Sequence, residues 1–194
     1  MYQKTFLSPH FTLQELCASQ TAVKLGIVNV PSELEVENLR RLCEGCLEPL
    51  REAIGLPVII TSGFRTKALN DKLAHASSTS QHMRGEAADL YVGSGFLDEP
   101  SDRVERTVQG SQDSQARMSD KVEAGFSRRE LLIKAFKEIL LNPKIDFDQL
   151  ILYPSFIHVS YVSKERNRRG ILLARSDGKL GYGRITRANA RKIN

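Results

Sequence analysis

Residues 147–162 contain two short runs of strand type with almost nothing between them. They read FDQLILY and FIHVSYV, and only Pro154 and Ser155 separate the two. A connection of two residues permits antiparallel pairing alone, because parallel strands need a crossover of about a dozen residues or more. The sequence therefore predicts a hairpin here, and the rest of the fold has to be built around it.

The remaining apolar patterns predict a mixture of strands and helices. Further strands are expected over residues 57–64, 86–92 and 170–176. Apolar residues at helical spacing predict helices over residues 11–19, 32–54, 66–74 and 127–143. Helices come early and in the middle, strands pair as hairpins, and no βαβ alternation is visible. We therefore expect an α+β fold, with a small antiparallel sheet and flanking helices.

The amino-acid composition of the chain changes between Gly93 and about Gly125. This stretch is rich in Ser, Asp, Gln, Arg and Gly and poor in large apolar residues. It cannot bury enough surface to fold alone, so it predicts a long surface loop or a partly disordered insertion. We expect one domain over residues 1–194, with this insertion at about 93–125 and a basic C-terminal extension at about 164–194.

Length and composition limit the class of protein. The 194 residues, of which 41% are apolar, suffice for a domain with a sizeable core. The sequence contains no run of 18 apolar residues, so no membrane-spanning helix is predicted. The first residues lack the apolar segment of a secretory signal. The protein is expected to stay in the cell that makes it or to leave by a route that the sequence does not reveal.

Three cysteines without a secretory signal argue against a disulfide framework. Cys43 and Cys46 form a C-x-x-C pair, which could indicate a redox or zinc site. They lie, however, within a helical pattern, and no second pair accompanies them. Free cysteine behaves as a small buried hydrophobe, so core packing is the favoured interpretation.

The net charge of +5 is concentrated late in the chain, in SKERNRRG (163–170) and RITRANARKIN (184–194). A basic stretch binds nucleic acid or another anionic polymer, or it is simply solvated. No aromatic residues interleave with it as stacking platforms for bases. A solvated tail is therefore favoured over a cell-envelope surface, and no nucleic-acid partner is expected.

Two of the four histidines lie in patterns that suit a metal site. In FIHVSY, Phe156, His158 and Ser160 share one face of a strand, which would present the imidazole to a cleft. In SQHMRGEAADL, His82 and Asp89 flank Gly85, where the chain can fold back. Two imidazoles and one carboxylate form a three-ligand zinc set that leaves a fourth position for water. The alternatives are a satisfied, half-buried histidine and a chance pairing.

Arg65 follows a strand end in TSGFRT. An arginine exposed at a sheet edge can hold a carboxylate or a developing oxyanion in bidentate fashion. Its alternative is an ordinary surface arginine.

Together these stretches resemble the M15 peptidase family, in particular its phage and bacterial members related to zinc D-Ala-D-Ala carboxypeptidases. The resemblance rests on FTLQELCASQTA, ITSGFRTKALN, SQHMRGEAADL and FDQLILYPSFIHVSY, in that order. It implies the small α+β fold shared with the hedgehog signalling domain and a zinc peptidase that cuts peptidoglycan stem peptides. It also implies His82, Asp89 and His158 as zinc ligands, and Arg65 and Ser80 as substrate-binding residues.

One departure from the family concerns the general base, usually a glutamate shortly before the last histidine. Here that stretch reads LILYPSFIH and holds no carboxylate. Asp148 and Tyr153 are the nearest candidates for a catalytic role, and Glu86 is a weaker one. Tyr153 is a poor base near neutral pH, because its unperturbed pKa is about 10.

The resulting hypothesis is a zinc-dependent hydrolase of cell-wall peptides, of carboxypeptidase or endopeptidase type, whose activity is weak. The alternative is a zinc-containing, wall-binding or structural module of a phage particle that has lost the base. Either would be made in the cytoplasm or released as a phage protein, and a monomer is expected.

Overall fold

The computed structural model describes residues 4–74, 76–93, 126–174 and 180–181, which fold into helices and one sheet. In space the strands follow the order β1-β2-β4-β3-β5-β6. They are β1 (Val58–Ser62), β2 (Ala87–Val92), β3 (Gln149–Leu152), β4 (Ile157–Ser160), β5 (Gly170–Ala174) and β6 (Leu180–Gly181). The predicted α+β class and the β3–β4 hairpin are confirmed.

The prediction of a wholly antiparallel sheet is wrong at one pair. β5 pairs with β3 in parallel, whereas the other neighbours pair antiparallel. The cause is the connection over residues 161–169, which carries the chain from β4 past β3 and reverses its direction. Residues 164–169 of this connection belong to the stretch predicted as a basic extension, and they lead into the strand predicted at residues 170–176, observed as β5.

Eight helical elements occur among the described residues. They are α1 (Leu13–Cys17), α2 (Gln20–Leu25), α3 (Glu33–Leu42), the π-helical turn η1 (Cys43–Leu47), α4 (Glu48–Ile54), α5 (Lys67–Asn70), the 3-10 turn η2 (Gln81–Arg84) and α7 (Arg128–Leu141). The sequence did not predict α2 or η2. Residues 94–125, which include nearly all of the predicted insertion, lie outside the described residues.

The helix predicted over residues 32–54 is continuous from α3 through η1 to α4. A capping box formed by Ser32 and Glu35 begins it, and Gly55 ends it in the left-handed conformation. Cys43 and Cys46 lie in the π-helical turn and are fully buried as free thiols. Burial raises the pKa of Cys43 to about 12, so the thiol stays protonated and unreactive. Their prediction as core residues is confirmed.

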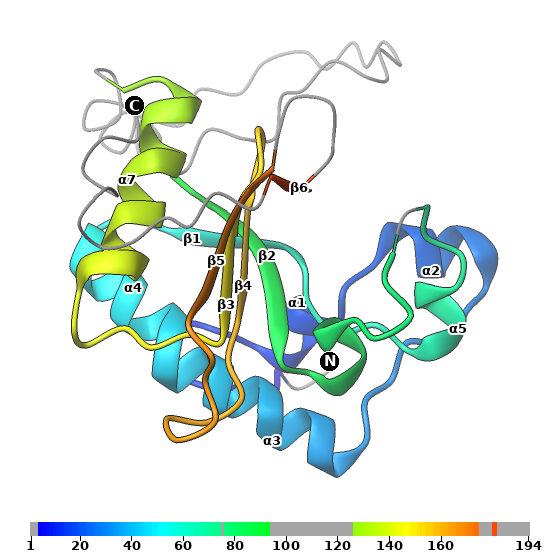
Figure 1. Ribbon diagram of the computed structural model, residues 1–194. Helices are drawn as coiled ribbons and strands as arrows, with labels where there is room; N and C mark the ends of the chain where they lie inside the picture. The colour runs from blue at the N-terminus through cyan, green and yellow to red at the C-terminus, as the bar shows by residue number, and fades with distance from the viewer. Residues whose placement is uncertain (1–3, 75, 94–125, 175–179, 182–194) are drawn as a thin grey trace, which may run out of the picture.

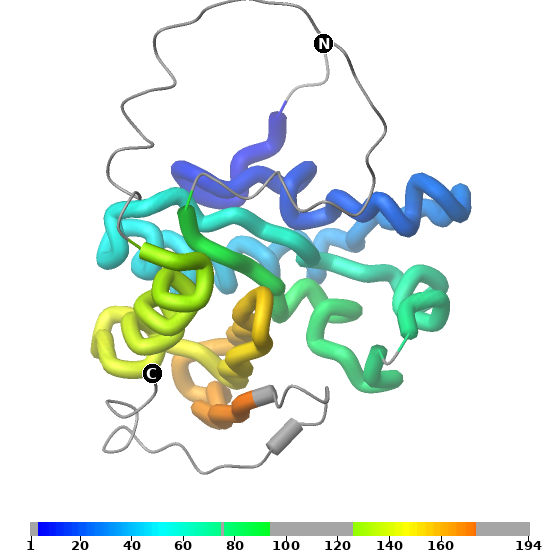
Figure 2. Tube along the Cα trace, turned by 90° about the horizontal axis from the view of Figure 1, so that it is seen from above, coloured from blue at the N-terminus to red at the C-terminus, as the bar shows by residue number. Residues whose placement is uncertain are grey.

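Among the described residues, the helices pack with one face of the sheet to form the core. Figure 1 shows the stretch α3–η1–α4 running beneath the strands and α7 standing beside them, while α2 and α5 lie at the far end. Figure 2, turned by 90°, also separates α2 and α5 from α7. Strand residues of one parity pack into the buried core with these helices: Leu90, Val92, Leu150, Leu152, Ile157 and Val159. Residues of the other parity project from the opposite face of the sheet, where Tyr91 and Ile151 are also buried.

No helix among the described residues has the length and apolar character needed to cross a membrane.

Candidate metal centre

The register between β2 and β4 brings Asp89 and His158 together. The two residues are direct cross-strand partners, although 69 positions separate them in the chain. Opposite residues of an antiparallel pair project from the same face, so both side chains point away from the core. His158 Nδ1 lies 2.8 Å from Asp89 Oδ1.

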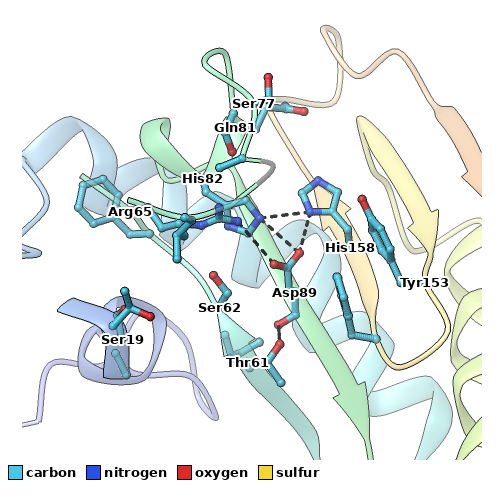
Figure 3. Close-up of a pocket in the computed structure, with 18 of the residues that line it drawn as sticks. Ser19, Thr61, Ser62, Arg65, Ser77, Gln81, His82, Asp89, Tyr153 and His158 are labelled. Carbon is cyan, nitrogen blue, oxygen red and sulfur yellow. Dashed lines mark hydrogen bonds and ion pairs between the residues drawn. The ribbon is translucent and has the colours of Figure 1, made fainter. Parts of the chain in front are cut away.

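His82 reaches the same point from η2. Its Nδ1 donates a hydrogen bond of 2.7 Å to the carbonyl of Gly63, which can only accept. That bond fixes the proton on Nδ1 and leaves the lone pair of Nε2 directed at Asp89 and His158 (Figure 3). The imidazole is 2% exposed, and burial lowers its pKa, an effect that the charge of Asp89 only partly offsets. The ring is therefore neutral, as a metal ligand must be.

The spacing of the three ligand atoms suits a zinc ion. His82 Nε2 lies 3.2 Å from His158 Nδ1 and 3.3 Å from Asp89 Oδ1. Ligand atoms bonded at 2.0–2.2 Å to a tetrahedral ion are about 3.3–3.6 Å apart. The remaining separation, 2.8 Å between His158 and Asp89, needs to widen by roughly 0.5 Å for the same geometry. The predicted set His82, Asp89 and His158 is thus assembled, and its donors fit zinc.

Asp89 is held as a carboxylate. Burial alone would raise its pKa, but the adjoining His82 and His158 rings outweigh burial and lower the pKa well below its usual range. An ionised carboxylate beside two imidazoles provides the negative charge that a divalent cation needs.

Arg65 contacts the same carboxylate through its other oxygen. Its Nη2 lies 3.6 Å from Asp89 Oδ2, and its backbone N–H donates to the carbonyl of His82 at 3.1 Å. The side chain is only 12% exposed, and its Nε has no hydrogen-bond partner. A buried N–H of a guanidinium without a partner is costly, which favours an incoming anionic or carbonyl oxygen at this position.

These groups form the floor of a cleft of about 1740 Å³. The cleft extends from α2 and the loop that contains Ser77 and Ser80, across β2, to Tyr153 and Arg128. Its volume exceeds the roughly 300–1,000 Å³ of pockets for small molecules. Its basic lining residues are Lys24, Arg65, Arg84, Arg128 and Arg168, and Asp89 is the one acidic residue among the described lining residues.

Tyr153 also lines the cleft, immediately after β3. Its ring stacks on Phe156 with centroids 4.3 Å apart, beside His158 (Figure 3). Burial raises the pKa of the phenol, the charge of Asp89 raises it further, and Arg65 opposes the shift. The phenol therefore remains protonated at neutral pH and acts as a hydrogen-bond donor rather than as a base.

Asp148, the other candidate for a catalytic role, is turned away from the cleft. Its carboxylate is 1% exposed and pairs with Arg168 through Oδ1–Nε at 2.9 Å. Burial raises its pKa, but the hydrogen bonds from Arg168 lower it by more, so the group stays ionised. Asp148 has the same parity as Leu150 and Leu152, which face the core. The alternation of residues in FDQLILY could therefore have indicated that Asp148 points toward the core and away from the cleft. Its selection as a possible base is not supported by this position.

Gly85 shapes the turn between His82 and Asp89. Its φ is +66°, and a Cβ atom there would lie 2.4 Å from the carbonyl oxygen of Glu35. Gly55 has nearly the same φ, +67°, but open space around it. We expect Gly55→Ala to cost about 1 kcal/mol from backbone strain alone. Gly85→Ala adds a clash with backbone, so we expect at least about 2 kcal/mol, measured by denaturant unfolding. Equal losses in the two variants would contradict this reading of the turn.

Sequence reasoning missed the residues that support the ligands. Gln81, Ser160 and Arg168 form a hydrogen-bonded group with Asp148 next to the metal centre. No spacing in the sequence connects Gln81 with Arg168, because β-sheet pairing brings them together.

Comparison with known proteins bears on these residues. The family model described as Peptidase M15 matches residues 9–130, more than half of the chain. Arg65, Ser80, His82 and Asp89 lie within the match, whereas His158 lies beyond it and is joined to the cluster by the geometry of the site. A comparison with curated proteins returned no match. The chain belongs to the peptidase M15 family, whose members are metal-dependent peptidases.

Proposed function

We propose that this chain is a zinc-dependent peptidase that acts on the stem peptides of bacterial peptidoglycan. The main support is the juxtaposition of the His82, Asp89 and His158 donors on the floor of a long, basic cleft. Stem peptides are short, carry several carboxylates and lack bulky folded structure, which matches a cleft with five basic lining residues.

His82 Nε2, Asp89 Oδ1 and His158 Nδ1 would hold the metal. When bound, zinc lowers the pKa of its water to about 7 and polarises the scissile carbonyl. Arg65 is proposed to hold a substrate carboxylate or the oxygen on which charge develops, since its guanidinium lies beside Asp89 with an unpaired Nε. Ser80 lines the same cleft and is proposed to contact the peptide.

Tyr153 is proposed to donate a hydrogen bond to the developing oxyanion. Loss of one such donor typically costs about 10²–10³ in kcat. We expect Tyr153→Phe to lower turnover within that range and to leave zinc content unchanged. Tyr161→Phe is the matched control, because Tyr161 lies over Gly45, away from the cleft. A Tyr153→Phe variant as active as wild type would show that the ring only packs on Phe156.

A second function is favoured by one specific observation. No glutamate lines the cleft in the described part of the chain, and its one carboxylate, Asp89, is committed to the metal. General acid–base catalysis usually contributes about 10²–10⁴-fold in rate. A module that binds wall peptides and hydrolyses them slowly is therefore the alternative.

One experiment separates the two. The purified chain is incubated with a defined stem peptide after zinc loading, after chelation and after zinc restoration, and the products are identified by mass spectrometry. Cleavage that chelation stops and zinc restores supports the peptidase. Peptide binding without products in any state supports the binding module. Release of the terminal residue indicates a carboxypeptidase, and cleavage of an internal bond indicates an endopeptidase.

A further inference from the structure

A buried polar network lies beside the metal ligands and connects three segments of the chain. Gln81 donates from Nε2 to Asp148 Oδ2 at 3.0 Å and accepts at Oε1 from the Ser160 hydroxyl at 2.9 Å. Arg168 completes it, with its Nε 2.9 Å from Asp148 Oδ1 and its Nη2 2.5 Å from Oδ2. Figure 3 shows Gln81 above His82 and Asp89 below it.

The network acts on both histidine-bearing segments. Gln81 directly precedes His82 in η2, and Ser160 follows His158 by two positions on β4. The side chains of Gln81, Asp148 and Ser160 are buried, so each polar group needs its partner. A buried network in which every member is satisfied restricts the backbone that carries it.

Arg168 supplies the positive charge that balances the buried Asp148 carboxylate of this network. It comes from the connection between β4 and β5, and its backbone N–H also donates to Asp148 Oδ1 at 2.8 Å. Its side chain is 67% exposed, whereas that of Asp148 is 1% exposed. Removing the guanidinium would leave a buried carboxylate without its charge partner, which is costly and forces the group to protonate or to move. A protonated carboxyl group accepts more weakly from the Gln81 amide, and a displaced one no longer accepts from it, so the bond to Gln81 is weakened in either case.

We propose that Gln81, Asp148 and Arg168 are positioning residues of the metal centre, which hold η2 against β4 so that His82 Nε2 and His158 Nδ1 stay 3.2 Å apart. The proposal rests on the metal site proposed above. It assigns Asp148 a role that does not involve contact with substrate or metal.

The chain supplies a matched control for a purely structural role. Arg169, the next residue, forms an ion pair with Asp146, two positions before Asp148. Asp146 also accepts from Asn167 at 2.8 Å, and Arg169 lies over the Phe147 ring at 4.7 Å. Both pairs therefore connect the same two segments, but only Arg168 and Asp148 bond to Gln81 in the described contacts.

The experiment compares zinc affinity in the purified full chain, by chelator competition and without peptide, for wild type, Arg168→Ala, Arg168→Lys and Arg169→Ala. Changes in groups that orient metal ligands typically cost about 10–100-fold in affinity. We expect Arg168→Ala to lose about tenfold or more and Arg169→Ala to stay within about twofold. Arg168→Lys, which keeps the charge but not the planar fork, should recover part of the loss. Cobalt-substituted Arg168→Ala should also show an altered visible spectrum.

Thermal unfolding in excess chelator measures the stability of the metal-free form of each variant. If Arg168→Ala does not fold, Gln81→Leu replaces it, because that change leaves the Asp148–Arg168 pair intact and is expected to weaken zinc similarly. Equal zinc affinities for the Arg168→Ala and Arg169→Ala variants, or for Gln81→Leu and wild type, would overturn the proposal. Wild type that binds no zinc would instead overturn the proposed function itself.

Discussion

Replacing His82 with alanine is expected to reduce bound zinc from about one ion per chain to background after reconstitution. The change removes one of three protein ligands, the one whose tautomer is fixed by the Gly63 carbonyl. Zinc should also raise the thermal unfolding midpoint of wild type, because a ligand at 100 times its Kd stabilises the folded state by about 2.7 kcal/mol. The variant should lose this increase.

His10→Ala is the control for this experiment. His10 is half exposed, pairs with Glu48 at 2.8 Å and does not line the cleft. It should bind zinc as wild type does. A His82→Ala variant that keeps a full equivalent of zinc with unchanged affinity would disprove the ligand assignment.

The second large effect is expected at Arg65. Arg65→Met should lower kcat/KM on a stem peptide by about 10²–10³, the typical loss for one oxyanion or carboxylate donor in a catalytic site. Zinc content should not fall, because the guanidinium is not a ligand and its charge opposes that of the metal. Arg65→Lys should give an intermediate rate, since an ammonium keeps the charge but cannot present two parallel donors.

Arg41→Met serves as the control, since Arg41 forms an exposed pair with Glu37 on α3. If wild-type turnover is too slow to measure, the affinity for the peptide replaces the rate, and Arg65→Met should weaken it at least about tenfold. An unchanged rate and affinity in Arg65→Met would mean that this side chain only supports Asp89.

The cluster of His82, Asp89 and His158 could be predicted from the sequence, because few residue types bind zinc and because each residue lay in a short motif that resembles the M15 family. The hairpin fixed the direction of β4, and alternation fixed the face of His158. The nitrogen that each imidazole offers could not be predicted, because His82 uses Nε2 only by virtue of its bond to Gly63, 19 positions away. His158 instead offers Nδ1.

The helices whose ends carry capping boxes, α3 and α7, were predicted almost to the residue. α2 and η2, of six and four residues, were missed, whereas α1 and α5, of five and four residues, lie in stretches predicted as helices. Helices this short show too little periodicity for a dependable prediction in either direction. The parallel partner of β3 was missed for another reason. The length of the connection over residues 161–169 allows β5 to pair on either side of the hairpin, and only packing against the rest of the sheet decides between them.

The basic segment 163–170 shows how composition alone misleads. It was expected to be solvated, but Arg168 and Arg169 pair with Asp148 and Asp146. Positive charges that appear unbalanced along the chain are balanced across the sheet. A count of charge in the sequence cannot reveal this, because the partners lie 20 and 23 positions away.

The pairing of β2 with β4 also determines when the protein can acquire its metal during synthesis. His82 and Asp89 leave the ribosome long before His158, which follows Asp89 by 69 residues. Until β4 emerges, the nascent chain offers two donors and a solvated β2 edge, which is a poor zinc site. Metal binding at this cluster and closure of the sheet would therefore be one late step, and a metal bound then would link β2 to β4.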